Sequence, residues 1–151
     1  EQLARTSDYQ WTKKGRMGLV YGRLFIPDLL GRAREVNLED KNPFIAVEVV
    51  DTHFPSLDTF KALLECTKNL PLIVAFYYCK HAPRVNHMKK PLRDGAYARV
   101  RVTHYLADGS FWERNERLEE KARISPERHD EYYNYIVEYV YREWLVRRGG
   151  D

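Results

Sequence analysis

The chain has 151 residues, of which 44% are hydrophobic and 31% are charged, and its formal net charge is +3 at pH 7. This composition predicts a folded globule, most simply a single domain over 1–151 that is long enough to bury a core. No apolar run approaches the roughly 20 residues that a bilayer-spanning helix needs, which argues against a membrane protein.

The start of the chain and its cysteines bear on the compartment. The first residue is Glu1 rather than Met, consistent with a domain excised from a larger protein, and nothing near it resembles a signal peptide. Cys66 and Cys79 lie in apolar stretches and are too few for a disulfide framework. We therefore expect a protein of the cytoplasm, or of the nucleus in a eukaryote, and not a secreted one.

The N-terminal part of the chain predicts β-structure after a short helical end. The segment up to Tyr9 is interpreted as the end of a helix. Residues 15–31 (GRMGLVYGRLFIPDLLG) are interpreted as a strand or hairpin, with glycines at the turns. Residues 43–50 (PFIAVEVV) are rich in β-branched and aromatic side chains, and they predict a buried strand.

A helix and another strand follow. A helix is predicted over 56–69 (SLDTFKALLECTKN), because Ser56 can cap it and apolar side chains recur on one face. Residues 70–79 (LPLIVAFYYC) predict a second buried strand. Together with 43–50 these segments form a βαβ unit, whose two strands should be parallel in one sheet.

The C-terminal part predicts a hairpin and a long helix. Residues 96–106 (AYARVRVTHYL) alternate between apolar and polar, an Asp-Gly pair follows as a turn, and 111–118 is the return strand. A Ser-Pro pair then opens a helix predicted over 125–148. If that helix exposes its apolar face, it would join a second copy in a homodimer or bind a larger protein.

A basic block lies between the predicted βαβ unit and the hairpin, within the loop and hairpin region 80–118. From Lys80 to Arg101 it contains seven Lys or Arg residues against one acid, Asp94. Such a block is either a solvated face or a surface that binds a polyanion. As a nucleic-acid surface it would hold the phosphate backbone without sequence preference. The contacting residues would include Lys80, Arg84, Lys89, Lys90 and Arg93.

Two carboxylates stand in apolar surroundings. Asp28 ends the apolar strand LFIPDLL, and Glu48 lies inside the strand FIAVEVV. Ionised groups resist desolvation, so each needs a partner. One possibility is structural, with Asp28 in a turn and Glu48 paired with an arginine such as Arg23, Arg32 or Arg34. The other is a shared divalent cation, since Mg²⁺ prefers hard oxygen ligands.

The spacing of Pro27, Asp28 and Glu48, within RLFIPDLLG and NPFIAVEVVDTH, resembles the PD-(D/E)XK nuclease superfamily. The resemblance covers a core of about 15–80. It implies a central mixed β-sheet flanked by helices, with the restriction-endonuclease-like order α-β-β-β-α-β. It also implies that Asp28 and Glu48 hold one or two Mg²⁺ (or Mn²⁺) ions and that the protein hydrolyses phosphodiester bonds of nucleic acid, most simply DNA.

The sequence departs from that superfamily at one position. The lysine expected two residues after Glu48 is replaced by Val50. Lys61, on the following helix, is one candidate for a migrated catalytic lysine. His53 could turn back toward the metal or the phosphate after the strand ends. The alternative is a catalytically degenerate module that binds nucleic acid or a protein partner within a larger complex.

Overall fold

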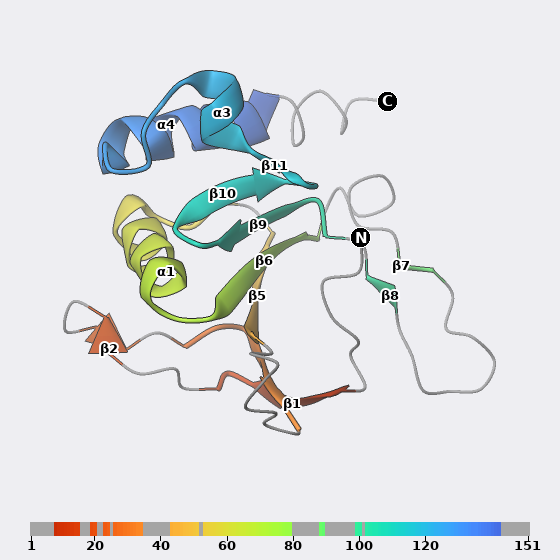
Figure 1. The fold of residues 1–151 in the computed structure, drawn as a ribbon. Coiled ribbons are helices and arrows are strands. Elements are labelled where there is room, and N and C mark those ends of the chain that lie inside the picture. Colours follow the sequence, from red (N-terminus) through yellow and green to blue (C-terminus); the bar gives the residue numbers. More distant parts are fainter. Residues whose placement is uncertain are drawn as a thin grey trace.

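The computed structural model describes residues 8–15, 19–20, 23–24, 26–34, 43–51, 53–79, 88–89, 99–100 and 102–142. These residues form a mixed α/β fold around a seven-stranded sheet with the order β1-β4-β5-β6-β9-β10-β11 (Figure 1). Two short hairpins stand apart from that sheet: β2 (Leu19–Val20) with β3 (Arg23–Leu24), and β7 (Met88–Lys89) with β8 (Arg99–Val100). The predicted class, α/β with a mixed sheet, is confirmed.

Three antiparallel strands form one side of the sheet: β1 (Tyr9–Lys13), β4 (Leu29–Ala33) and β5 (Phe44–Val50). The helix predicted up to Tyr9 falls largely outside the described residues, and Tyr9 itself begins β1 instead. Asp28 was expected to end a strand, but it directly precedes β4. The apolar residues that follow it pair with β5.

The predicted βαβ unit is confirmed as β5, α1 (Leu57–Asn69) and β6 (Leu72–Tyr78). The two strands are parallel along their whole length, from Phe44 opposite Leu72 onward. Ser56 caps α1, since its hydroxyl accepts a hydrogen bond from the N–H of Thr59 at 3.3 Å. The helix ends where Leu70 becomes extended, as expected for a residue that precedes a proline.

The other side of the sheet is an antiparallel meander of β9 (His104–Ala107), β10 (Ser110–Glu113) and β11 (Glu116–Arg117). Asp108 and Gly109 form its first turn with φ of 51° and 69°, the backbone that a tight two-residue hairpin requires. The return strand predicted over 111–118 is interrupted, because Arg114 turns with φ of 58°. It therefore divides into β10 and β11.

Two helices complete the described chain, α3 (Leu118–Ala122) and α4 (His129–Tyr139). The helix predicted over 125–148 begins later, because the Ser125 hydroxyl accepts from the N–H of Glu127 in a turn that precedes α4. Ile136 and Val140 of its apolar face are buried in the core. The predicted stretch beyond 142 lies outside the described residues, and the homodimer or larger complex through the helix 125–148 stays a prediction.

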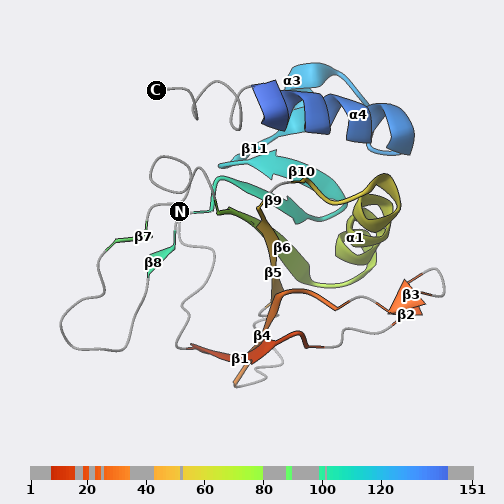
Figure 2. The ribbon, with the colours of Figure 1, turned by 180° about the vertical axis from the view of Figure 1, so that it is seen from behind.

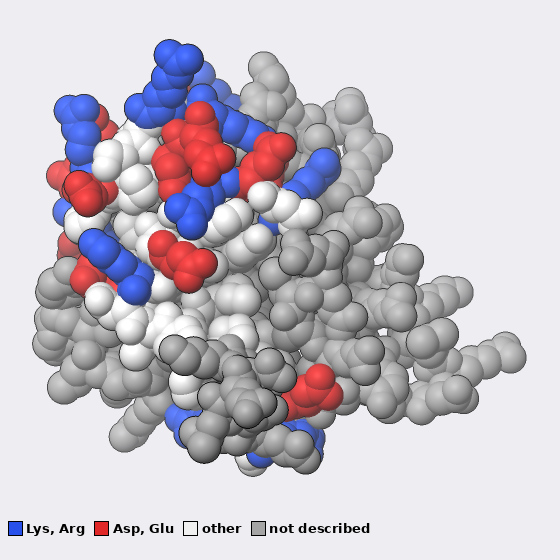
Figure 3. Space-filling view, viewed as in Figure 1, with Lys and Arg blue, Asp and Glu red and all other residues white. Residues whose placement is uncertain are grey.

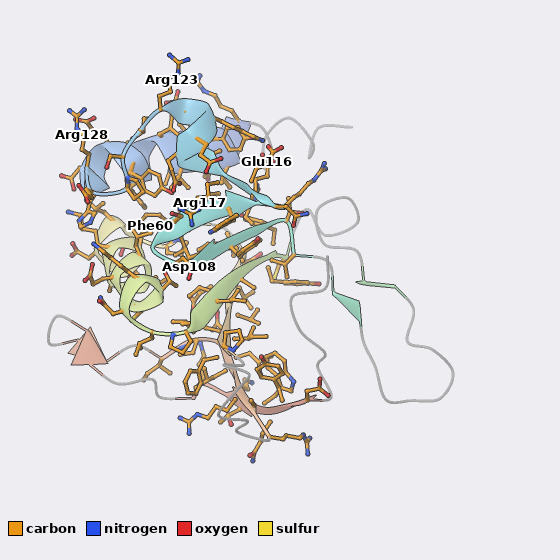
Figure 4. The ribbon with its side chains drawn as sticks, viewed as in Figure 1. Phe60, Asp108, Glu116, Arg117, Arg123 and Arg128 are labelled. Atoms are coloured by element: carbon orange, nitrogen blue, oxygen red, sulfur yellow. The ribbon has the colours of Figure 1, made fainter. Side chains whose placement is uncertain are left out.

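The described helices α1, α3 and α4 cover one face of the sheet, and β7 and β8 lie on its other side (Figures 1 and 2). The core fills the space beneath the helices. Phe60 lies between α1 and α4 (Figure 4), with its ring centroid 5.4 Å from that of Tyr133 and 6.3 Å from that of Tyr132. Among the described residues, no helix is both long and apolar enough to cross a membrane.

Candidate active site

Three charged residues meet where β1, β4 and β5 lie side by side. The register of β4 and β5 pairs Leu29 with Val47, so the next residues along the two strands are Asp28 and Glu48. On the other side of Asp28, the N–H of Lys14 donates to its carbonyl oxygen at 3.1 Å. The sheet thus places Lys14, Asp28 and Glu48 on three neighbouring segments, in one cross-strand row.

Both carboxylate oxygens of Asp28 have partners. Its Oδ1 forms an ion pair with the ammonium of Lys14, and its Oδ2 accepts from the backbone N–H of Val49 at 2.9 Å. Partial burial opposes ionisation of Asp28, but these two donors outweigh it and lower the pKa of its carboxyl group. Asp28 is therefore ionised at neutral pH and fixed in orientation.

Glu48 occupies a much less polar place. Ala46 and Val50, which share its face of β5, are both buried in the core. Its partner in β6 is Phe76, which is only 1% exposed. The side chain of Glu48 therefore starts on the apolar face that the sheet turns toward the helices, which is an unfavourable position for a charge.

One carboxylate oxygen of Glu48 is buried and unsatisfied within the described part of the chain. Its Oε1 is buried and has no hydrogen-bond partner among the described residues. Burial and the nearby Asp28 carboxylate together raise the pKa of Glu48 to about 7. An unsatisfied buried oxygen beside a second carboxylate is unfavourable by itself, and a bound cation would relieve both problems.

The donor set fits magnesium better than zinc. The described residues contain no group of three or more His, Cys, Asp or Glu side chains that could hold a metal. Structural and catalytic zinc sites use at least three protein ligands. Mg²⁺ usually binds through one or two carboxylates and keeps several waters, and Asp28 and Glu48 can supply such a pair.

Val50, at the position where the superfamily pattern expects lysine, is a core residue. It is 3% exposed, belongs to the hydrophobic cluster beneath the helices, and lies opposite Tyr78 of β6. A lysine here would have to place its ammonium in or beside that apolar cluster, where a charge loses its hydration. Val50 therefore serves the packing of the core, and a catalytic cation would have to come from another residue.

The two other predicted catalytic residues, Lys61 and His53, lie on segments that follow β5. Lys61 belongs to α1, where its ammonium is 2.6 Å from a carboxylate oxygen of Asp130 and so links α1 to α4. His53 is exposed on the segment between β5 and α1, and its role stays a prediction. The structure thus joins Asp28 with Glu48, and the lysine that it pairs with Asp28 is Lys14.

The predicted nucleic-acid surface is mostly outside the described residues. Lys80, Arg84, Lys90 and Arg93 all lie there. Lys89 lies in β7, where its backbone pairs with that of Arg99 in β8. On the face seen in Figure 3, the described Lys and Arg side chains are interspersed with Asp and Glu. The basic block therefore stays a prediction for phosphate binding.

A second buried polar group, which the sequence did not indicate, lies across β6, β9 and β10. The hydroxyl of Tyr78 is 2.8 Å from Nδ1 of His104, and Nε2 of His104 is 3.8 Å from a carboxylate oxygen of Glu113. Tyr139 of α4 donates to the other oxygen of Glu113 at 2.7 Å. These contacts tie α4 to the sheet, and we interpret them as structural.

Lys14 is the site residue that the sequence interpretation missed. A usable signal is present in YQWTK, residues 9–13, where Tyr9 and Trp11 alternate with polar residues as in an exposed edge strand. Pairing of that strand with the one after Asp28 would have brought the next residue, Lys14, beside the carboxylates.

Comparison with known proteins gives no assignment. No protein-family model, curated protein or solved structure matches the chain.

Proposed function

We propose that the protein is a metal-dependent nuclease, with DNA as its substrate and Mg²⁺ or Mn²⁺ held by Asp28 and Glu48. One observation carries the proposal. Asp28, directly before β4, and Glu48 of β5 are cross-strand neighbours, and Oε1 of Glu48 is buried without a partner among the described residues. The order of three antiparallel strands, α1 and the parallel β6 supports the PD-(D/E)XK resemblance.

The reaction is hydrolysis of a phosphodiester. The oxygen of a water molecule bonds to phosphorus, and the bond from phosphorus to one sugar oxygen breaks. One proton of that water goes to the leaving oxygen, and the other is lost to solvent from the new phosphomonoester. When bound, a divalent ion acts as a Lewis acid on the phosphate and makes the attacking water more acidic.

The chain's own residues prepare this chemistry. The N–H of Val49 and the ammonium of Lys14 fix the Asp28 carboxylate, so that little reorganisation is needed when it binds a cation. Glu48 is held against the apolar core, where its attraction for a cation is weakened less by water. The pair is therefore pre-organised for a doubly charged ion.

A second candidate function keeps the fold without the catalysis. Val50 replaces the lysine of the superfamily pattern and is buried, which favours a module that binds nucleic acid or a protein partner in a larger complex. Such a module would bind DNA without cleaving it.

The test compares cleavage of duplex DNA, single-stranded DNA and RNA by the whole chain in Mg²⁺, Mn²⁺ and EDTA. We expect cleavage that depends on the metal and that is slower by at least roughly 100-fold in Asp28→Asn and Glu48→Gln. Loss of a residue that only orients a metal ligand already reduces activity by up to about 100-fold, so loss of a ligand should cost at least as much. Glu120→Gln, an exposed carboxylate on α3, is the matched control and should cleave normally.

Cleavage that persists unchanged in both site variants, or in EDTA, would refute the proposal. If wild type binds DNA without cleaving any substrate, and calorimetry detects no binding of Mg²⁺ or Mn²⁺, the second candidate is the correct one.

A further inference from the structure

Lys14 is held at the site by its backbone as well as by its charge. It follows β1 directly, and its N–H bonds to the carbonyl of Asp28. Its φ of 52° is left-handed, a conformation that glycine or asparagine would adopt more easily. Arg114 and Arg123 are also left-handed, but at turns of the C-terminal part. What distinguishes Lys14 is that its strained backbone stands beside two carboxylates.

The ammonium of Lys14 faces both the carboxylates and the solvent. It forms the ion pair with Asp28, and it is also close enough to Glu48 for that carboxylate to help raise the pKa of the lysine, although the hydrogen bond to Asp28 has the larger effect. At the same time the side chain is 59% exposed. It can therefore reach a phosphate that approaches from outside without leaving the site.

We propose that Lys14 has two roles. Before a divalent ion binds, its ammonium competes with that ion for Asp28. Once the ion is bound by the carboxylates, the ammonium contacts the scissile phosphate and provides the positive charge that Val50 cannot. The inference rests on the nuclease function proposed above. Oδ1 of Asp28 is occupied by the lysine and Oδ2 by the N–H of Val49. A metal ion that binds Asp28 must share or displace one of these donors, and the lysine is the movable one.

The competition gives Lys14 two opposite effects. Without the ammonium, the carboxylates would be more available to a metal, so metal affinity should rise. The phosphate would lose a positive charge that stabilises the transition state, so cleavage should slow. If Lys14 had only a structural role, its replacement would not raise the metal affinity while lowering the rate of cleavage.

The experiment uses the whole chain with Lys14→Met, which keeps the length of the side chain and removes its charge. Lys13→Met, an exposed lysine one residue earlier in β1, is the matched control. Binding of Mn²⁺ is measured by calorimetry, and kcat and KM are measured for DNA cleavage. We expect Lys14→Met to bind Mn²⁺ about two- to fivefold more tightly, the range that loss of an exposed ion pair allows, and to have a kcat at least about 100-fold lower. Lys13→Met should match wild type in both.

Lys14→Arg is a second variant, which keeps the charge and should keep the wild-type affinity for Mn²⁺. If wild type cleaves DNA and Lys14→Met cleaves equally well, the Lys14 inference is wrong while the nuclease function stands. If wild type does not cleave, the nuclease function fails, and the calorimetry still decides on the competition. Equal Mn²⁺ affinity in wild type and Lys14→Met would then overturn it.

Discussion

The carboxylate of Asp28 accepts a hydrogen bond from the backbone N–H of Val49, with 2.9 Å between Oδ2 and the nitrogen. One side chain thus fastens the start of β4 to β5 and forms half of the carboxylate pair. We predict that Asp28→Asn loses activity but stays folded, because its amide oxygen can still accept this bond. Asp28→Ala should be less stable than Asp28→Asn by about 1 kcal/mol in urea unfolding. Equal stabilities would show that the bond does not matter.

The partly buried carboxylate of Glu48 should destabilise the fold, although the proposed function needs it. Its buried Oε1 has no partner among the described residues, its neighbour in β6 is the apolar Phe76, and its neighbour on the other side is the carboxylate of Asp28. We predict that Glu48→Leu raises the free energy of unfolding by about 1 kcal/mol in EDTA, while cleavage disappears. Urea unfolding of wild type, Glu48→Leu and the control Glu120→Gln measures this. A less stable Glu48→Leu would mean that the carboxylate is satisfied in the fold.

Introducing a lysine at position 50, where the PD-(D/E)XK pattern has one, should destabilise the fold. Val50 is 3% exposed in the cluster that includes Tyr78 and Phe54. We predict that Val50→Lys lowers the free energy of unfolding by about 3 kcal/mol, because a charged side chain would replace a packed apolar one in the core. Val50→Ile is the size control and should lose much less. A Val50→Lys variant that is stable and cleaves faster would show that the buried lysine is accepted after all.

The local parts of the fold were predictable because several signals agree there. Ser56 at the cap, the apolar face of α1 and Pro71 at its end all point to the same helix, and two buried strands flank it. The spacing of Asp28 and Glu48 likewise carried enough information to predict that they are neighbours, although Asp28 precedes β4 and does not end a strand.

Long-range pairing was not predictable in the same way. Lys14 reaches Asp28 only because β1 pairs with β4, and residues 9–13 alone do not reveal that register. The burial of Val50 depends on which face of β5 receives the helices, a tertiary property. Arg114 turns with a positive φ that its residue type does not favour, so the break between β10 and β11 left no clear signal.

The hydroxyl of Tyr132 accepts the hydrogen bond that a neighbouring strand would otherwise accept from the backbone N–H of Phe111. It accepts from the N–H of Phe111 at 2.7 Å and donates to Glu119 at 2.9 Å. The short β11 pairs only with the last two residues of β10, so it does not serve Phe111. We predict that Tyr132→Phe lowers the free energy of unfolding by about 1–3 kcal/mol, because a buried N–H loses its acceptor. Tyr141→Phe, an exposed tyrosine, should change it by less than about 0.5 kcal/mol in the same urea titration.

Acid should weaken the buried polar group around Glu113. Desolvation favours its protonated form, but the neighbouring His104 ring, the hydrogen bond from Tyr139 and the nearby charge of Lys121 outweigh it and lower the pKa of Glu113 to about 2, from an ordinary 4.5. A carboxyl group whose pKa is lower in the folded state stabilises the fold fully above its unfolded pKa. That stabilisation is lost as the pH falls from about 4.5 toward 2.

The contribution of Glu113 is measured as the difference in unfolding free energy between wild type and Glu113→Gln, from urea titrations between pH 7 and pH 3. We expect the difference to be constant above about pH 5 and to shrink steadily below it. Glu120→Gln, whose carboxylate is exposed on α3, should show a small difference that does not change with pH. A difference for Glu113→Gln that stays constant down to pH 3 would mean that Glu113 is not held in its ionised form by these partners.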